Sequence, residues 1–578
     1  MTELIAIDIE TTSTGKILGI GVYKPGKYMW YTLDNLPSNL TDYVQTYHGG
    51  SFDIIYGIKN GITCFRHDHD TLIMSSLLPY EKHDLESLAV KELHMKSWKK
   101  MLNIKKLEDE PIATVIAYNK LDCRATYELH VKLARRLQSL GLWNYYKNYS
   151  MNLRRELNTL EQQGIKLDMT KLTEIRSQYA NTREDKEKYI KETYKAGIRY
   201  IQTRLLQKVC SKVKTQAAKN NRRQDPAKYN ALFNLQSSQH VLKLLGFYDV
   251  YPTKFDKKAM QVKPSTSTEA LSKLDTPLIT AYREWRKANK MLQFFNSWED
   301  KQVDGILTPR YNQHTVVTGR LSSSNPNIQQ VPVRDNPEIR ELFIPHNPNN
   351  VFIVADYGQL ELRLAGYFSQ DEKLIDVIKS GKDFHGKIAC DVFNLTCDPD
   401  ECKEMYHTER AISKTIVYLT IYGGSAEALQ SKLSIEGYDY TLPECKAFLK
   451  AFSKAYPGLK GYTYLIGSHS EKQGYCKTLF GRKIYFKKGE AMHFALNYQL
   501  QGSGTELTTF ALIGLGPVVR AFGGSIISTI HDEVIVECPK DKVEQVKNAI
   551  QHNMVSKVNL TVPLEVSVTV GNSWGCKE

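Results

Sequence analysis

Aspartates that follow apolar runs are the residues of this chain best suited to hold divalent cations. Residues 351–355 form such a run before Asp356, and residues 526–530 form another before His531 and Asp532. Each aspartate should end a strand, and two strand ends that meet would bring the carboxylates together. Two cations held there suit nucleotidyl transfer, because one activates the attacking hydroxyl and the other binds the departing pyrophosphate.

A second group of acids lies in the first quarter of the chain. Asp8 and Glu10 are two positions apart on an expected strand, so both side chains point the same way. Tyr118 and Asp122 are one helical turn apart, and Asp53 lies in a short helical or loop segment between the two pairs. Hard divalent cations prefer such oxygen ligands, and four carboxylates with a tyrosine suit a two-metal hydrolase. Surface acids in a chance DxE pattern are the alternative.

Two cations and two aromatic residues recur at intervals of four positions in the helical segment that follows residue 371. On one helix they would form a stripe about 18 Å long at about 1.5 Å per residue. Such a stripe can hold a triphosphate at one end and stack a base at the other. By itself the row also fits an amphipathic helix with a mixed face. The four residues are Arg410, Lys414, Tyr418 and Tyr422.

The elements that must position these residues divide the chain into regions of different pattern. The first region is α/β, with strands expected at 4–9 and 17–23 and helices at 85–93 and 112–137. A long helical region follows at 151–298, and a region of loops and short strands at 305–348. A second helical region covers 371–501, and strands around one helix cover 525–570. We predict an α/β and α+β multidomain protein.

Composition narrows the class of protein further. The 578 residues carry a net charge of +14, which favours a polyanionic partner, and no apolar run is long enough to span a membrane. The ten cysteines are scattered without a CxxC pair, which suits a reducing cytoplasm. Cys397 and Cys402, with His385 and His407 nearby, match no common zinc spacing.

The positive charge is concentrated in residues 196–232. This stretch holds nine Lys or Arg and one acid, Asp225, so nine minus one gives +8 of the total +14. A solvated helical face is one interpretation. A surface that tracks phosphates or docks a partner is the other, and the local density favours it.

The motifs around the two aspartates resemble those of family A DNA polymerases. VFIVADYGQLELR (351–363) resembles motif A, IHDE (530–533) resembles motif C, and the row from Arg410 resembles the helix of the fingers that binds nucleotide. The resemblance implies a right-hand fold of thumb, palm and fingers. It also implies that Asp356 and Asp532 hold two Mg²⁺ ions, for which Mn²⁺ can substitute, that Glu533 supports this metal site, and that His531 touches the primer end.

The resemblance assigns roles to further residues. Arg410, Lys414 and His385 would hold the triphosphate, Tyr418 and Tyr422 would govern the base, and Glu361 would exclude a 2′-hydroxyl, with Gln359 also at the substrate. Tyr at 418 implies tolerance of dideoxynucleotides. Residues 318–329 resemble the template–primer clamp of the family. The implied DNA-binding residues are Arg320, Asn497, Gln501 and His531.

The N-terminal acids resemble the tyrosine form of the DEDD 3′–5′ exonucleases. Asp8, Glu10, Asp53 and Asp122 match the metal ligands, and Tyr118 matches the residue that orients the attacking water. The resemblance implies an RNase H-like domain, again with two Mg²⁺ ions.

Together these patterns predict DNA synthesis from dNTPs on primer–template DNA with 3′–5′ proofreading. Since the chain starts at the exonuclease strand, we expect a phage-type replicative member without a 5′-nuclease domain. We also expect a monomer in the cytoplasm of a bacterial host. A processivity factor is expected to bind at the thumb insertion. An exonuclease with a DNA-binding scaffold and a single-subunit RNA polymerase are the alternatives. The expected ranges are exonuclease 1–145, thumb 146–304, palm 305–375, fingers 376–498 and palm 499–578.

Overall fold

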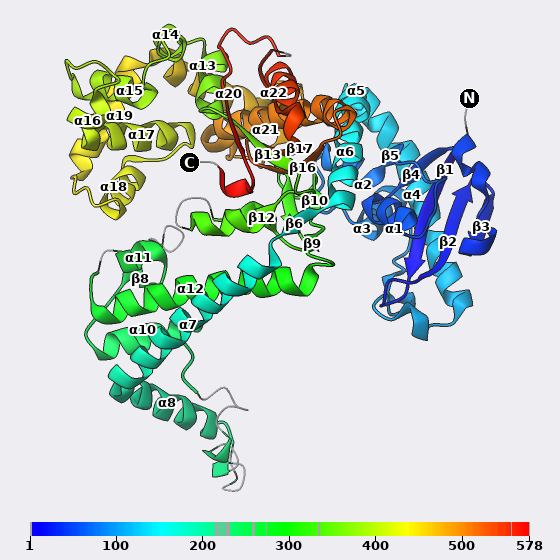
Figure 1. The fold of residues 1–578 in the computed structure, drawn as a ribbon, viewed down its shortest axis with the longest axis horizontal. Helices are drawn as coiled ribbons and strands as arrows, with labels where there is room; N and C mark the ends of the chain where they lie inside the picture. The colour runs from blue at the N-terminus through cyan, green and yellow to red at the C-terminus, as the bar shows by residue number, and fades with distance from the viewer. Residues whose placement is uncertain are drawn as a thin grey trace. The chain divides into compact units, whose positions relative to one another are not determined.

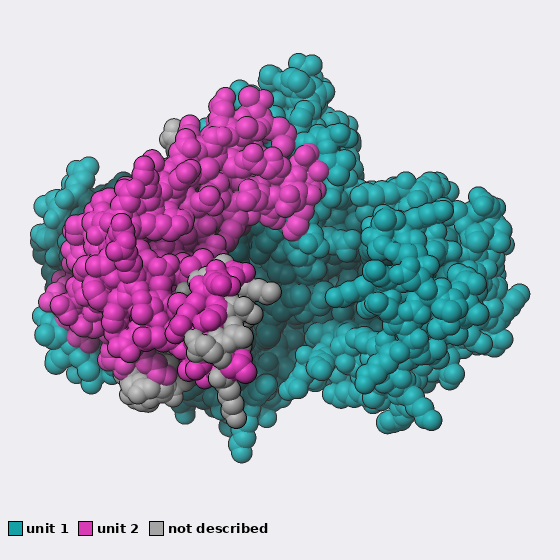
Figure 2. All heavy atoms as spheres, turned by 90° about the horizontal axis from the view of Figure 1, so that it is seen from below, with its two compact units in different colours: residues 1–167, 303–429, 441–578 teal, residues 168–302, 430–440 magenta. Residues whose placement is uncertain are grey.

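The computed structural model describes residues 3–576, apart from 214, 216–218, 221–222, 226–231, 257–260, 273, 333–335 and 557. The chain forms two compact units, coloured separately in Figure 2. Unit 1 comprises residues 1–167, 303–429 and 441–578, and unit 2 comprises residues 168–302 and 430–440. Among the described helices, none combines the length and the apolar character needed to cross a bilayer.

The N-terminal part of unit 1 is built on a five-stranded sheet with the order β3-β2-β1-β4-β5 (Figure 1). The central strand β1 (Leu4–Thr11) runs antiparallel to β2 (Ile17–Lys24) and parallel to β4 (Val44–Tyr47). β3 (Lys27–Tyr31) and β5 (His69–Asp70) form the edges. β1 occupies the centre because Ile5, Ile7 and Ile9 are all buried. The two strands predicted from the sequence are confirmed.

Four helices accompany this sheet: α1 (Ser51–Lys59), α2 (Thr71–Ser76), α3 (Leu85–Leu93) and α4 (Ile112–Ser139). The long helix α4 packs on β1 and β2. Its Leu129, Leu133 and Leu137 recur at helical spacing and are fully buried. This packing brings one face of α4 to the central strand, and the arrangement of sheet and helices is the RNase H-like fold expected from the sequence.

The second sheet of unit 1 has four antiparallel strands in the order β16-β17-β13-β18. They are β16 (Ser525–Ile530), β17 (Glu533–Pro539), β13 (Asn350–Tyr357) and β18 (Val566–Gly571). The helix α21 (Ala491–Ala521) packs on β16 and β17, while α13 (Leu360–Ser369) follows β13 and packs on α21. β16 and β17 form a hairpin around His531 and Asp532, the strand predicted before His531 is confirmed, and this sheet corresponds to the palm.

Along the chain of unit 1, a group of helices follows β13 and α13 and precedes α21 (Figure 1). It includes α15 (Phe384–Phe393), α16 (Cys402–Met405), α17 (His407–Ile421), α19 (Leu442–Ala455) and α20 (Pro457–Gln473). α15 packs on α17 and α19, and α16 packs on both α15 and α17. These helices correspond to the fingers.

Unit 2 is a helical body built on the pair α7 (Met169–Thr193) and α12 (Pro277–Lys301), which lie side by side (Figure 1). α8 (Lys195–Cys210) and α10 (Ser238–Phe247) pack on each other in the same body. Its core contains Ile190, Leu244, Tyr282 and Trp285. Of the basic stretch 196–232, residues 214, 216–218, 221–222 and 226–231 lie outside the described residues.

Two expected domain boundaries differ from the units. The thumb was expected from residue 146, whereas unit 2 begins at Asp168. The helix α6 (Met151–Gln163) belongs to unit 1. Its buried Arg154 donates to the carbonyl of Tyr311 at 2.7 Å, and its Glu161 accepts a hydrogen bond from the backbone N–H of Tyr311 at 2.8 Å. The expected boundary at 498 falls inside α21, which runs without a break from the fingers into the palm.

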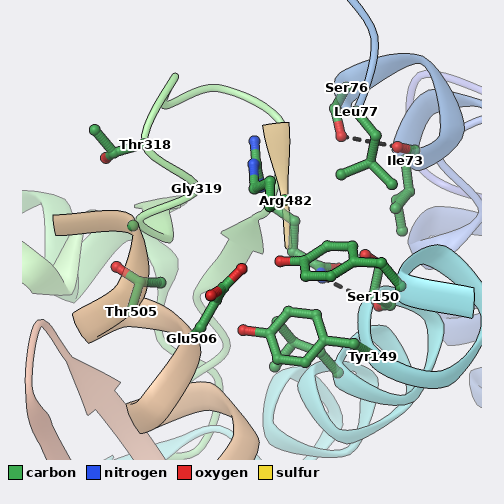
Figure 3. Close-up of a pocket in the computed structure, with 14 residues that line it drawn as sticks. Ile73, Ser76, Leu77, Tyr149, Ser150, Thr318, Gly319, Arg482, Thr505 and Glu506 are labelled. Carbon is green, nitrogen blue, oxygen red and sulfur yellow. Dashed lines mark hydrogen bonds between the residues drawn. The ribbon is translucent and has the colours of Figure 1, made fainter. Parts of the chain in front are cut away.

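One buried acid of α21, Glu506, is not among the predicted site residues. Thr478 Oγ1 donates to Glu506 at 2.6 Å, and the backbone N–H of Phe480 donates to it at 2.9 Å. Figure 3 shows Glu506 in a pocket with Tyr149 and Arg482. Complete burial raises the pKa of Glu506 from 4.5 to about 7 in spite of these hydrogen bonds. The folded protein therefore favours the protonated acid.

This raised pKa predicts a pH-dependent stability. Because the fold binds the proton more tightly than the unfolded chain, the contribution of Glu506 is fully present below pH 4.5 and is lost as the pH rises through about 7. Wild type should lose about 3 kcal/mol of unfolding free energy relative to Glu506→Gln over this window. Denaturant unfolding at a series of pH values measures the difference. Glu372→Gln, at an exposed position, controls for loss of one charge; parallel curves for wild type and Glu506→Gln would refute the assignment.

Candidate active sites

Three of the N-terminal acids meet where α4 crosses β1. Carboxylate oxygens of Asp8, Glu10 and Asp122 all lie within 4.8 Å of one another. Asp8 and Glu10 share one face of β1, and α4 brings Asp122 to that face. The spacing that the sequence showed thus becomes a carboxylate cluster.

The other two predicted residues of this group flank the cluster. Asp53 lies in the first turn of α1, is buried, and accepts a hydrogen bond from the backbone N–H of Ile9 at 2.9 Å. Ile9 lies between Asp8 and Glu10, so this bond ties α1 to the strand that carries both acids. Tyr118 lies one turn before Asp122 on α4. Burial raises the pKa of Tyr118, and the charges of the nearby carboxylates raise it further.

Two neighbours of the cluster were not predicted from the sequence. The Asn119 side-chain amide donates to Asp8 at 2.7 Å and to Glu10 at 3.2 Å. The Trp98 indole donates to Asp122 at 2.7 Å. Asn119 stands three positions before Asp122, so helical spacing could have indicated it. Nothing in the spacing indicates Trp98, which comes from a separate loop.

The cluster is electrostatically suited to a hard divalent cation. Burial raises the pKa of Asp8, and the charges of Glu10, Asp53 and Asp122 raise it further. Burial also raises the pKa values of Glu10, Asp53 and Asp122, each to about 7. A bound cation would offset this desolvation and repulsion, and oxygen donors of this kind are the ligands that Mg²⁺ prefers.

The second candidate site lies at the ends of β13 and the β16–β17 hairpin. Asp356 pairs in register with Glu533 across β13 and β17, and Ile530 pairs with Glu533 to leave a two-residue turn. His531 in that turn has φ +56°, the left-handed conformation that tight hairpin turns require. The backbone N–H of Tyr357 donates to the carbonyl of Asp532 at 3.3 Å. The backbone thus brings Asp532 beside the end of the strand that carries Asp356.

Glu533 lies in a buried ion pair. The Trp574 indole donates to its carboxylate at 2.7 Å, and Arg340 approaches both carboxylate oxygens at 3.4 Å. Arg340 also lies over the Trp574 ring, 4.1 Å from its centroid. Neither partner was predicted. The carboxylate of Glu533 is thus fixed by partners on two other segments, in the position directly across the ladder from Asp356.

Glu361 is held by two of the other predicted residues. Arg320 donates to one carboxylate oxygen and the Tyr422 hydroxyl to the other, each at 2.7 Å. Glu361 lies in the first turn of α13 and is buried. Gln359, the exposed residue just before α13, has φ +52° and lets the chain turn sharply from strand to helix. The arrangement fixes a carboxylate close to the end of the strand that carries Asp356.

The row of residues on α17 is largely as predicted, with one correction. α17 ends at Ile421, so Tyr422 is its C-cap and lies just beyond the helix. Its ring centroid lies 6.2 Å from that of Tyr418. Lys414 is exposed, whereas Arg410 is engaged in a bidentate pair with Asp383. A substrate phosphate would therefore have to share the Arg410 guanidinium with Asp383.

His385 and the predicted residues of α21 complete the site. The ring centroid of His385 lies 6.0 Å from that of Tyr418. Burial lowers the pKa of His385, and the positive charges of Lys414 and Arg410 lower it further, to about 4. Its Nδ1 is buried without a hydrogen-bond partner among the described residues, as is Oδ1 of Asn497. Gln501 follows Asn497 by one turn of α21 and is half-buried. Unpaired buried polar atoms of this kind fit a site that a polar ligand completes.

Known proteins of similar sequence are DNA polymerases. A thermostable DNA polymerase I of Thermus filiformis is 31% identical over 358 residues, which cover 59% of this chain and 42% of that protein. A DNA polymerase I of Pseudomonas aeruginosa is 29% identical over 361 residues, which cover 59% of this chain and 38% of that protein. The chain therefore spans less than half the length of these relatives.

A solved structure shares the whole fold. It is described as the POL domain of Pol1 from M. smegmatis in complex with DNA primer-template and dNTP. Its TM-score is 0.81 at 22% identity, and the match covers 100% of this chain and 96% of that one.

Two family models match successive parts of the chain. The 3′–5′ exonuclease model matches residues 2–138, and the model of DNA polymerase family A matches residues 203–576, more than half of the 578 residues. Enzymes of both families are metal-dependent, generally on Mg²⁺. The chain therefore belongs to DNA polymerase family A and carries a 3′–5′ exonuclease domain.

Proposed function

We propose that this protein synthesises DNA from dNTPs on a primer–template and proofreads its product in the 3′–5′ direction. The observation that carries the proposal is the β13–β17 register, which sets the Asp532 turn against the strand end with Asp356. Of the expected ranges, the proposal retains those of the exonuclease (1–145) and of the first palm segment (305–375).

In the proposed polymerase site, Asp356 and Asp532 hold two Mg²⁺ ions, with Mn²⁺ able to replace them. Bound Mg²⁺ would lower the pKa of the primer hydroxyl and balance the charge of the triphosphate. Glu533 lies beside the two aspartates and supports the metal site, and Arg340 neutralises its charge. His531 contacts the primer end. Arg340 and Trp574 act by fixing Glu533 in place, since neither reaches substrate in the proposal.

The fingers orient the nucleotide in this proposal. Lys414 is exposed at the site and binds the triphosphate, together with Arg410 and His385. Burial lowers the pKa of His385 to about 4, and its buried Nδ1 has no hydrogen-bond partner among the described residues. Tyr418 and Tyr422 contact the base and sugar. Glu361 is held by Arg320 and Tyr422 and blocks a 2′-hydroxyl, with Gln359 beside it. Arg320, Asn497 and Gln501 contact the minor groove of the primer–template.

In the proposed exonuclease site, Asp8, Glu10, Asp53 and Asp122 hold the divalent metal ions. Tyr118 orients the attacking water, and its raised pKa keeps the phenol protonated as a hydrogen-bond donor. Asn119 and Trp98 hold the carboxylates in position. Product shortened by one nucleotide leaves with a free 3′-hydroxyl, which the polymerase site can extend again.

The two activities should be separable by substitution. Asp532→Ala should lower nucleotide incorporation by about 10³-fold or more while the protein still shortens a labelled primer. Asp8→Ala should extend the primer without shortening it. Both are measured with a labelled primer–template, four dNTPs and Mg²⁺.

Exposed acids provide matched controls for these substitutions. Asp541→Ala, in the segment after β17, and Asp109→Ala, in the N-terminal domain, should leave both activities unchanged. Degradation without extension by wild type would make the exonuclease the primary function and the polymerase half a DNA-binding scaffold. Extension with ribonucleotides as readily as with dNTPs would instead favour an RNA polymerase.

Sugar selection tests the contacts of Glu361. Glu361→Ala should lower the preference for dNTP over rNTP in kcat/KM by at least about tenfold, because the side chain that excludes the 2′-hydroxyl is gone. Tyr422→Phe should give a smaller decrease, since it removes only the hydroxyl that holds Glu361. Tyr418→Phe removes a hydroxyl from the neighbouring ring and should keep the preference. Unchanged selection in Glu361→Ala would remove Glu361 from this role.

The thumb contributes a basic surface in the proposal, on the described part of residues 196–232. Arg199, Arg204 and Lys208 are exposed on α8. They would bind either the DNA backbone or an acidic processivity protein.

The proposed location is a reducing cytoplasm. All ten cysteines are free, which fits this location.

Reversing the charges of Arg199, Arg204 and Lys208 distinguishes the two partners. If α8 binds DNA, the triple Glu variant should make shorter products per binding event, and the slope of log affinity against log salt should flatten by up to about 2.7. If α8 docks a partner, the slope should be unchanged and stimulation by the processivity protein should be lost. Reversal of Lys446, Lys450 and Lys454, exposed on α19, is the control. No change in either measurement would leave α8 a solvated face.

A further inference from the structure

Three cysteines of the fingers converge although they are separated in the sequence. Cys390 lies in α15, Cys397 in the following loop, and Cys402 begins α16. Their Sγ atoms all lie within 4.8 Å of one another. Cys402 is completely buried, Cys390 is nearly so, and Cys397 is partly exposed. In the sequence, Cys397 and Cys402 with His385 and His407 match no common zinc spacing; the structure adds Cys390 to the two cysteines and changes the donor set.

The spacing of the sulfurs fits metal coordination. A Zn–S bond of about 2.3 Å places two thiolates of a tetrahedron about 3.8 Å apart. The Sγ atoms of Cys390 and Cys397 are 3.7 Å apart, whereas a disulfide requires about 2.05 Å. Three sulfurs packed as ordinary apolar side chains are the alternative explanation. Three convergent thiols form a soft donor set of the kind that zinc and copper(I) prefer.

The backbone already holds the three sulfurs together. The backbone N–H of Leu395 donates to the carbonyl of Cys390 at 3.0 Å, and that of Cys402 donates to the carbonyl of Pro399 at 3.3 Å. The loop also crosses α15 so closely that a Cβ on Gly386 would come within 2.1 Å of the Pro399 carbonyl oxygen. A cation would therefore meet a site whose ligands are largely in place.

The cations nearest the thiols are already paired with carboxylates. Arg410 interacts electrostatically with Cys402 and forms a bidentate pair with Asp383. Lys387 lies three positions before Cys390 on α15 and pairs with Asp391 at 3.1 Å. Three thiolates around a divalent cation carry a net charge of −1, and three cysteines leave the fourth position of a tetrahedron to water or a small ligand.

We propose that Cys390, Cys397 and Cys402 form a structural site for a thiophilic d¹⁰ cation, with zinc as its test ion. The bound ion would link α15 to α16, and both helices pack against α17, which carries Arg410 and Lys414. It would thus stabilise the base of the helix assigned to the triphosphate. The ion takes no part in nucleotidyl transfer, so its loss is distinguishable from failure of the proposed polymerase function.

Cobalt(II) titration of the full-length protein tests the site in the presence of excess Mg²⁺, which occupies the carboxylate sites. Wild type should develop a thiolate-to-cobalt charge-transfer band in the near ultraviolet that saturates at about one equivalent and is abolished by zinc. Carboxylates cannot produce this band. Its absence would overturn the proposal. The measurement needs no substitution, so misfolding of a variant does not affect it.

Variants then identify the ligands. Cys390→Ser, Cys397→Ser and Cys402→Ser should each lose the band and the zinc measured by mass spectrometry of the metal. Cys445→Ser, at another buried cysteine of the fingers, should keep both. Removing zinc with a chelator should lower the melting temperature of wild type but not of Cys402→Ser. Equal zinc in all variants, or a protein mass that reveals a Cys390–Cys397 disulfide in place of metal, would refute the site.

Discussion

Burial of closely placed carboxylates, with the repulsion between them, is the constraint on which both candidate sites depend. Burial raises the pKa values of Glu10, Asp53 and Asp122 to about 7, so the cluster resists full ionisation while no cation neutralises it. The fold opposes this repulsion with hydrogen bonds from Asn119 and Trp98. Near Asp356 a cationic side chain serves the same purpose, because Arg340 neutralises Glu533 directly across the ladder.

Several residues that are proposed to bind substrate already have partners within the protein. Glu361 is held by Arg320 and Tyr422, and Arg410 is held by Asp383. Pairing keeps buried charges satisfied before a substrate binds, at the cost of exchanging partners when it does. Lys414 is the exposed cation of the row and needs no such exchange to meet a phosphate. In the proposed function, the two cations of one helix face would therefore bind a nucleotide in different ways.

The helices that carry these residues depend on contacts outside their own sequence. α17 is an ordinary amphipathic helix, and its position is set by α15 and α16 beneath it. At its end, a Cβ on Gly423 would come within 2.4 Å of the His493 carbonyl oxygen, so only glycine allows α17 to approach α21 this closely. The row on α17 that is proposed to bind the nucleotide is therefore positioned from both ends, by the cysteine-bearing segment and by the long helix α21.

The sequence by itself determined the local elements and the residues with reactive side chains. Alternation placed Asp8 and Glu10 on one strand face, and apolar runs placed Asp356 and Asp532 at strand ends, because these patterns arise from backbone geometry over a few residues. Tertiary structure alone decided the partners. Arg340 and Glu533 are 193 positions apart, and Asn119 and Asp8 are 111 apart. Such pairs, like the convergence of Cys390 with Cys402, follow from how elements pack, and no local periodicity encodes them.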